Sequence, residues 1–423
     1  MARSADRKLL LALFVLTLCL VGTIILHLQQ DVAYYQLLEE TVQAERAAAS
    51  KWREAAEQGR QAMPQTLSPS TRLPMKVYIY DLPAEFNAEL LTDQPRCYTD
   101  QYGTEIKLHE YVEKSEHYTR DPAEAEFFLV PLYGECRLFR SIQQMGRDAA
   151  FKDTNLWFKR AMAIVMQEHP FWNRTQGRDH VFIFPGARGP HIFRDWKQYI
   201  KKSIFLTPEG DRSLTEQFNT WKDIVIPGLE DDIRFWTGHK REQFTERHYL
   251  AFFRGTIHNK GGKSYSRGIR IWLEERLRGH DDIIFTEQVP ECDRGCYHEE
   301  MCNSVFCLCP RGWSPWTLRA YQAMMLGCIP VIIADEIELP YEDDVDWSQL
   351  TVKIPEARAN ETLTILRGMP QATIKAKQAA IRKSWPMVAY PEPTRPGDAF
   401  HMVMQQLAKK ARKFKSSTDW YWL

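Results

Sequence analysis

The hydrophobic pattern from residue 75 onward alternates between short apolar runs and longer amphipathic segments. A short apolar run bounded by turn residues is typical of a buried strand, whereas apolar positions three and four apart indicate a helix. In the first half of this region we expect strands at 75–83, 125–133 and 179–186, and helices at 105–115 and 157–169. Strands that alternate with helices predict a parallel sheet with right-handed crossovers.

The same pattern starts again at His248. We expect strands at 248–255, 281–286, 302–310 and 328–335, helices at 265–277 and 315–327, and a last helix at 398–413 that could pack on either domain. The chain is therefore expected to be an α/β protein with two Rossmann-like domains, 75–245 and 246–423, facing one cleft. Ligands of such sheets bind at the carboxyl ends of the strands.

The N-terminus carries an apolar stretch that predicts a membrane anchor. Residues 9–28 contain no charge, and a helix of this length can cross a bilayer. Basic residues precede it, so the positive-inside rule predicts a cytosolic tail (1–8), a signal anchor (9–28) and a luminal remainder that begins with a helical stem and linker (29–74). A cleaved signal peptide is the alternative, but the apolar stretch is longer than such peptides require.

Composition and cysteine usage narrow the class of protein. The 55 basic and 55 acidic residues give no net charge, which argues against a nucleic-acid partner. Of the nine cysteines, Cys19 lies in the predicted anchor, and the other eight are expected to form disulfides of undetermined connectivity, as is usual in a secretory lumen. The spacing of the cysteines from Cys292 to Cys309 lacks the paired CxxC arrangement of structural zinc sites.

Residues suited to an anionic nucleotide gather at the expected carboxyl ends of the second sheet. An arginine and a glycine follow the first strand, where a guanidinium can bind phosphate and glycine admits close backbone approach. The CPRGWSPWTLR stretch opens a helix, whose N-terminus attracts anions. The predicted nucleotide-binding residues are Arg254, Gly255, Arg311, Gly312, Ser314, Arg319 and Gln322.

Residues 306–341, FCLCPRGWSPWTLRAYQAMMLGCIPVIIADEIELPY, resemble the exostosin family, glycosyltransferase family 47, and within it the branch of plant xylan xylosyltransferases. FFRG, KSYSRGIR, WNRTQGRDH and RPGDAFHMVMQQLAKK extend the resemblance over about 75–415. The resemblance implies a Golgi type II membrane enzyme with the two-domain GT-B fold. It also implies inverting transfer of a sugar from a UDP-sugar to a polysaccharide or glycoprotein glycan, with xylose as the best estimate of the sugar.

One position departs from the family. Where the family usually carries a glutamate that is expected to accept hydrogen bonds from the nucleotide ribose, this chain has Gln322, which keeps an acceptor oxygen but lacks the charge. The alternative function is therefore a non-catalytic partner subunit that stabilises an active transferase, in a complex of like or unlike subunits. A nucleotide-sugar hydrolase or a lectin-like binder is a third alternative.

Inverting transfer requires a base that deprotonates the acceptor hydroxyl, and cations that stabilise the departing diphosphate. Arg254 and Arg319 are expected to serve the diphosphate. The base should come from the first domain, where the candidates are Asp81, His109, Glu110, Asp179 and His180.

We expect no metal site and no required cofactor, with the UDP-sugar as donor substrate. The sequence Asp344-Val-Asp346 matches the DxD pattern of metal-dependent transferases, but it lies in an acidic loop and is interpreted as loop structure.

Overall fold

The computed structural model describes residues 75–416, except for positions 93, 95–96, 168, 215–216, 233–234, 236–245, 260–261 and 289–292. The predicted cytosolic tail (1–8), signal anchor (9–28) and stem (29–74) lie outside the described residues. Within the part of the chain that is described, no helix combines the length and the apolar character needed to cross a bilayer.

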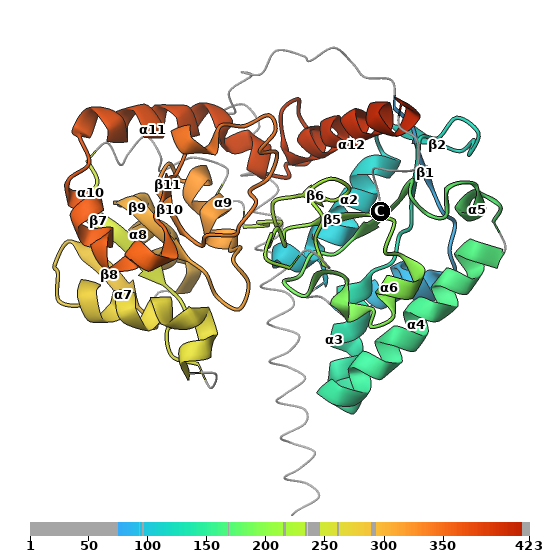
Figure 1. Ribbon diagram of the computed structural model, residues 1–423, viewed down its shortest axis with the longest axis horizontal. Helices are drawn as coiled ribbons and strands as arrows, with labels where there is room; N and C mark the ends of the chain where they lie inside the picture. Colours follow the sequence, from blue (N-terminus) through green and yellow to red (C-terminus); the bar gives the residue numbers. More distant parts are fainter. Residues whose placement is uncertain are drawn as a thin grey trace, which may run out of the picture. The chain divides into compact units, whose positions relative to one another are not determined.

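The first half of the described chain, coloured blue through green in Figure 1, is built on a parallel sheet. This sheet has six strands in the order β2-β1-β3-β4-β5-β6. The strands are β1 (Val77–Ile79), β2 (Tyr118–Thr119), β3 (Phe127–Leu129), β4 (His180–Ile183), β5 (Ile204–Thr207) and β6 (Ile224–Val225). The helices are α2 (Thr104–Glu113), α3 (Gly134–Met145), α4 (Arg147–Gln167), α5 (Phe171–Thr175) and α6 (Trp196–Tyr199). The three strands and two helices expected in this region are confirmed.

Both faces of this sheet are buried, which explains why its strands are apolar throughout. Along β3, Phe128 packs on one face, in the cluster that includes α3 and α4, whereas Phe127 and Leu129 pack on the other. Strand β4 alternates in the same way, with Phe182 on the first face and Val181 on the second. Such continuous apolar runs are typical of parallel strands covered by helices on both sides.

The second half is built on a parallel sheet of five strands in the order β11-β10-β9-β7-β8. The strands are β7 (Tyr249–Arg254), β8 (Ile283–Thr286), β9 (Ser304–Pro310), β10 (Ile329–Ile333) and β11 (Val352–Lys353). The helices are α7 (Ile269–Leu277), α8 (Asp293–Cys302), α9 (Leu318–Met325), α10 (Thr362–Arg367) and α11 (Gln371–Ser384). Two parallel sheets with helical crossovers confirm the predicted α/β class.

The last helix, α12 (Ala399–Ser416), packs on the first sheet. Its apolar residues Phe400, Val403 and Leu407 lie in the same buried cluster as Leu108 of α2 and Leu129 of β3. The sequence left open which domain this helix joins, because an apolar stripe on a helix does not identify its partner. The chain therefore returns to its first sheet after completing the second.

Backbone hydrogen bonds join segments that follow strands of the two sheets. The segment after β5 pairs with the segment after β10 through an antiparallel bridge between Asp211 and Ile337. The Arg212 amide donates to the Glu336 carbonyl over 2.9 Å, and the Glu338 amide donates to the Gly210 carbonyl over 2.7 Å. These bonds fix the carboxyl end of β5 against that of β10.

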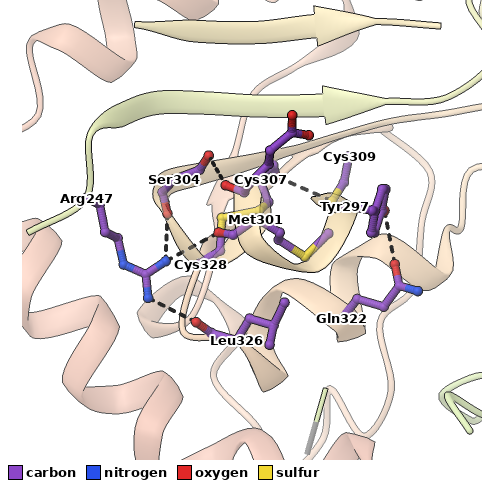
Figure 2. Close-up of a disulfide and its surroundings, with 10 residues drawn as sticks. Arg247, Tyr297, Met301, Ser304, Cys307, Cys309, Gln322, Leu326 and Cys328 are labelled. Carbon is purple, nitrogen blue, oxygen red and sulfur yellow. Dashed lines mark hydrogen bonds between the residues drawn. A yellow bond between two sulfur atoms is a disulfide. The ribbon is translucent and has the colours of Figure 1, made fainter. Parts of the chain in front are cut away.

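A disulfide between Cys307 and Cys328 closes the crossover from β9 through α9 to β10 (Figure 2). Close to the disulfide, the buried Arg247 guanidinium donates to the Ser304 and Leu326 carbonyls over 2.7 and 2.9 Å. Burial lowers the pKa of Arg247 to about 10. The disulfide and this arginine together hold the start of β9 against the end of α9.

The expectation of disulfides is confirmed for Cys97 with Cys136 and for Cys307 with Cys328. Cys296 is also disulfide-bonded. The expectation that all eight cysteines could pair is not met among the described residues, since Cys302 and Cys309 are buried thiols. The pairs join elements far apart in sequence, so their partners could not be read from cysteine spacing.

Removing the disulfide of the second sheet should destabilise the protein measurably. Replacing Cys307 and Cys328 together by alanine frees a crossover of about twenty residues, and we expect the free energy of unfolding to fall by about 3 kcal/mol. Equilibrium urea unfolding measures this difference. The variant Cys309→Ala removes a neighbouring thiol of the same strand and should cost about 1 kcal/mol. Equal losses in the two variants would contradict the covalent contribution.

Candidate functional site

The candidate site lies where β7 and β9 end, at the carboxyl edge of the second sheet. Strand β9 ends at Pro310, and the loop that follows leads to Thr317, whose side chain accepts from the Arg319 amide as the N-cap of α9. The disulfide from Cys307 to Cys328 encloses this loop and helix. The neighbouring strand β7 ends at Arg254. Such strand ends are where ligands bind in open parallel sheets.

Arg319 is buried beside the end of β7, and its guanidinium is only partly satisfied. The guanidinium lies 4.4 Å from the ring centre of Phe253, and its Nη2 donates to the Arg254 carbonyl. The Tyr297 hydroxyl lies near enough to interact with the charge. Among the described residues, however, neither Nε nor Nη1 of Arg319 has a hydrogen-bond partner in normal geometry. A buried cation with two unpaired donors is unfavourable until an anion binds it.

Arg270 of α7 adds a second buried guanidinium that the sequence predictions did not include. Its hydrogen bonds to described residues go to neutral oxygens: the Thr256, Pro310 and Arg311 carbonyls and the Tyr265 hydroxyl. It lies 5.3 Å from the same Phe253 ring. Burial, reinforced by the charge of Arg319, lowers the pKa of Arg270 to about 10. The two arginines therefore concentrate positive charge at the ends of β7 and β9.

Two of the predicted arginines are instead bound to carboxylates. Arg254 donates through Nε and Nη2 to Glu300 of α8, and through Nη1 to the Gln288 carbonyl over 2.7 Å. Arg311 donates from Nη1 to Glu356 over 3.1 Å. In this arrangement the Arg254 carbonyl accepts a hydrogen bond from Arg319 in the site. The Arg254 side chain is bound to Glu300 of α8.

Gly255 and Gly312 are required by the two buried guanidinium groups. Gly255 has φ of +155°, and a Cβ at this position would lie 2.9 Å from Nη2 of Arg319. A Cβ on Gly312 would lie 3.1 Å from Nη2 of Arg270. Close approach to the backbone was predicted at Gly255, but what approaches each of the two glycines in this structure is an arginine of the chain itself.

Ser314 and Gln322 contact carboxylates that follow strands of the first sheet. The Ser314 hydroxyl donates to Glu209, which follows β5, and the Gln322 amide donates to Glu230, which follows β6, over 2.5 Å. Burial raises the pKa of both carboxyls to about 7. Both acidic residues were missed, because only the tertiary structure brings them to the second sheet.

His109 is the predicted base that the structure surrounds with other titratable groups. Its Nδ1 lies 2.8 Å from the Tyr133 hydroxyl, and Tyr133 precedes α3 just after the carboxyl end of β3. Burial lowers the pKa of His109 against the opposing effect of Glu113 and Glu110, which favours a neutral imidazole able to accept a proton. At the N-terminal end of the His109 helix, the Thr104 hydroxyl accepts from the amide of Leu229 over 2.9 Å.

Two buried glutamates lie close to each other near the start of α3. Glu105, one turn before His109, accepts from the Gly134 and Cys136 amides at the start of α3 over 3.1 and 3.4 Å. Burial and the charge of Glu135 raise its pKa well above the ordinary value. Burial likewise raises the pKa of Glu135 to about 7, and its Oε2 has no partner among the described residues. The sequence could have indicated Glu135, because it lies in the run GECR directly after the predicted strand at 125–133.

The other predicted bases lie elsewhere. Asp81 is exposed after the carboxyl end of β1. Glu110 is half-buried, with Lys107 and Lys114 at 3.6 and 3.8 Å. Glu110 nevertheless lies close enough to His109 and Tyr133 for its charge to act on both.

Asp179 and His180 lie at the amino end of β4, the edge of the sheet away from the candidate site. Both are buried. Asp179 accepts from Arg174, Thr175 and the adjacent His180, and these bonds lower its pKa even though burial alone would raise it. His180 also lies 2.6 Å from the Tyr80 hydroxyl. The sequence could have indicated this position, because the two residues stand at the start of their predicted strand rather than at its end.

The two aspartates of the DxD pattern form hydrogen bonds that hold their own loop in place. Asp344 accepts from Lys409 and, over 2.6 Å, from Gln406, both on α12. Asp346 accepts from the Ser348 amide over 3.0 Å and so caps the turn Trp347–Gln349. The interpretation of this pattern as loop structure is consistent with these contacts.

Comparison with known proteins identifies the class to which this site belongs. Residues 72–369 match the exostosin GT47 domain. The chain belongs to the exostosin GT47 family and is a glycosyltransferase. It is 32% identical over 356 residues to the probable beta-1,4-xylosyltransferase IRX10 of Arabidopsis thaliana, covering 81% of this chain and 84% of that protein. It is 33% identical over 350 residues to the probable glucuronosyltransferase Os04g0398600 of Oryza sativa subsp. japonica, covering 79% and 80%.

Two solved structures resemble the chain at a greater distance. The calicheamicin glycosyltransferase CalG4 has a TM-score of 0.32 and 8% identity, covering 80% of this chain and 99% of that one. The complex of S. aureus MnaA with UDP has a TM-score of 0.31 and 11% identity, covering 80% and 96%.

Replacing Arg319, whose buried charge has no carboxylate partner, by an apolar residue should stabilise the protein. We expect Arg319→Met to raise the free energy of unfolding by about 1–2 kcal/mol, because it removes a buried charge without a carboxylate partner. Arg311→Met should instead lower it by about 1–2 kcal/mol, because it takes a partner from Glu356. Urea unfolding of both variants measures the difference. Changes of the same sign would contradict this assignment of charges.

The raised pKa of Glu135 predicts that the protein loses stability as pH rises. The pKa goes from 4.5 in the unfolded chain to about 7 in the fold, so the folded state binds the proton more tightly. The protonated Glu135 contributes its full share to the free energy of unfolding below pH 4.5, and this share is lost by about pH 7. Glu135→Gln should therefore gain up to about 3 kcal/mol over the unmodified chain at pH 8, and nothing at pH 4.5.

Thermal unfolding across this pH range is the measurement. Glu89→Gln, at an exposed position of the same domain, serves as the control and should keep the pH profile of the unmodified chain. A Glu135→Gln profile parallel to that of the unmodified chain would show that Glu135 titrates normally.

Proposed function

We propose that this glycosyltransferase transfers a sugar from a UDP-sugar to a polysaccharide or glycoprotein glycan with inversion, in a two-domain GT-B arrangement, and that xylose is the sugar. The observation that carries the proposal is the buried Arg319 guanidinium with two unpaired donors beside Arg270. A diphosphate supplies acceptor oxygens and negative charge to both arginines at once. Charge-assisted bonds of this kind are stronger than neutral ones.

The leaving group explains why these cations are useful in the reaction. As the bond from the sugar to the diphosphate breaks, negative charge develops on the diphosphate oxygens. Donors that are already fixed in a water-poor site stabilise this charge without reorganising. Arg319 is fixed by Phe253 and the Arg254 carbonyl, and Arg270 by three carbonyls and Tyr265.

His109 is the proposed base on the acceptor side. Its lowered pKa keeps the imidazole neutral near pH 7, and the Tyr133 hydroxyl orients the ring through Nδ1. Nε2 then accepts the proton of the acceptor hydroxyl as the new glycosidic bond forms. The reaction needs no metal ion in this proposal, because the two arginines neutralise the diphosphate.

The choice of xylose and of a glycan acceptor is supported by the relatives. One of them is named as a probable beta-1,4-xylosyltransferase, and another as a probable glucuronosyltransferase. Glucuronic acid is therefore the second donor to be tested.

The proposed location is the Golgi membrane, with type II topology and the described residues in the lumen. The apolar segment 9–28 supports an anchor, and disulfides such as those of Cys97 with Cys136 and Cys307 with Cys328 are usual in the secretory lumen. A complex with like or unlike glycosyltransferase subunits is compatible with this location.

The decisive experiment measures UDP release by the purified full-length chain. UDP-xylose and UDP-glucuronic acid are supplied with and without xylan oligosaccharides, and with and without EDTA. We expect acceptor-dependent release from UDP-xylose that persists in EDTA. Arg319→Met should reduce the rate by about a hundredfold or more, as does removal of one transition-state donor elsewhere.

Arg278→Met is the matched control, since this arginine is exposed at the C-cap of α7. It should release UDP at the unmodified rate. No release from any donor by a folded chain would instead favour the partner-subunit function, and loss of release in EDTA would overturn the metal-independent mechanism.

A further inference from the structure

The chain carries two N-glycosylation sequons, and both of their asparagines are exposed in the structure. One is Asn173-Arg-Thr in α5, and the other is Asn360-Glu-Thr, where the 3-10 segment Glu356–Glu361 leads into α10. An N-glycan is bulky and hydrated, so the asparagine that carries it must lie at the surface of the folded protein. Both asparagines meet this condition.

The sequon at Asn360 forms the turn that begins α10. Thr362, its third residue, is buried, and its hydroxyl donates to the Ala359 carbonyl over 2.7 Å. The transferase that attaches N-glycans reads this hydroxyl, so it must act before the segment folds. Asn360 is exposed in the folded chain, which therefore accommodates the glycan without rearrangement.

A groove of about 380 Å³ lies between the same 3-10 segment and α7, which packs against it. Its walls include Ala357 of the segment and Ile269, Ile271 and Trp272 of α7. Ile271 and Trp272 are only half-buried, so apolar and aromatic surface meets water here. Volumes of about 300–1,000 Å³ are usual for sites that bind small molecules.

Asn360 is held close to this groove. It follows Ala357 by three residues, so the two Cα atoms are at most about 11 Å apart. The segment is fixed at its start, where Glu356 accepts from Arg267 over 3.0 Å and from Arg311 over 3.1 Å. The first sugar attached to the Asn360 side chain therefore lies within reach of the groove.

We propose that Asn360 is N-glycosylated and that the first N-acetylglucosamine of its glycan covers the groove at Trp272. The negative face of an indole ring attracts the partly positive C–H groups of a sugar ring. Arg267 and Glu275, which also line the groove, supply polar partners for the hydroxyl and acetamide groups. The inference rests on the luminal location given under the proposed function, because N-glycans are attached only there.

The modification requires a lipid-linked diphosphate oligosaccharide and the transferase that uses it, both of which the secretory lumen supplies. The bond from C1 of the first sugar to the lipid diphosphate breaks, and a bond from C1 to Nδ2 of Asn360 forms. Nδ2 loses one proton, and the lipid diphosphate leaves.

Glycan mapping of the full-length chain from a eukaryotic host tests the site. An enzyme that removes N-glycans converts each occupied asparagine to aspartate, which mass spectrometry of peptides detects. We expect conversion at Asn360, loss of this glycan in Asn360→Gln, and its retention in Thr362→Ser, which keeps the sequon. Conversion at Asn173 alone would overturn the inference and leave the luminal location standing, whereas conversion at neither asparagine would overturn both.

Thermal unfolding tests the contact with the groove. The Asn173→Gln chain, in which Asn360 is the remaining sequon, is compared with its intact glycan, with the glycan trimmed to one N-acetylglucosamine, and with Asn360→Gln added. We expect Asn360→Gln to lower the Tm by about 2 °C, the scale of one lost contact in a large domain. The trimmed form should unfold within about 1 °C of the intact form, because the first sugar makes the contact.

Trp272→Leu keeps an apolar side chain in the groove but removes the indole ring. In this background the Tm difference between the glycosylated and Asn360→Gln forms should disappear. Trp221→Leu is the matched control, since Trp221 is an exposed tryptophan outside the groove, and it should retain the difference. An equal difference in both backgrounds, or a trimmed form that unfolds with Asn360→Gln, would overturn the contact. These measurements do not depend on UDP release, so they leave the proposed transfer reaction to its own test.

Discussion

The burial of two guanidinium groups without carboxylate partners is the constraint on which the site depends. Arg319 and Arg270 lie over one aromatic ring, Phe253, and their hydrogen bonds to the chain go to neutral oxygens. In water these groups would be fully hydrated, so the fold must compensate for the loss. It does so only in part, and the remaining unsatisfied donors are what an anionic ligand would complete.

The surrounding covalent and packing interactions keep the two charges in place. The disulfide closes the crossover that carries Arg319, and Arg247 holds the start of β9 against the end of α9. Gly255 leaves room for the Arg319 guanidinium. A less rigid frame could relieve the unfavourable charge by letting the arginines turn to solvent. Rigidity is therefore what keeps the site ready for an anion, at the expense of stability.

Three buried acids from the first half of the described chain favour the fold at low pH. Burial raises the pKa of Glu135, Glu209 and Glu230 to about 7 in each case. Each carboxyl is more easily buried when protonated, so all three favour the fold below neutral pH. Glu209 and Glu230 also contact residues of the second sheet, which connects the protonation of the first sheet with the geometry of the donor site.

The sequence by itself determined the α/β class, the main strands and helices, and the edge of the second sheet that carries the site, because periodicity and turn residues are local properties. It located Arg319 for the same reason, at the start of a helix after a buried strand. Only the tertiary structure decided which arginines are free to meet a ligand. Arg254 is bound to Glu300 and Arg311 to Glu356, each 45 or 46 residues away, whereas Arg270 joins the site from another helix. Pairing across such separations depends on how the chain packs, so it cannot be predicted from a local sequence pattern.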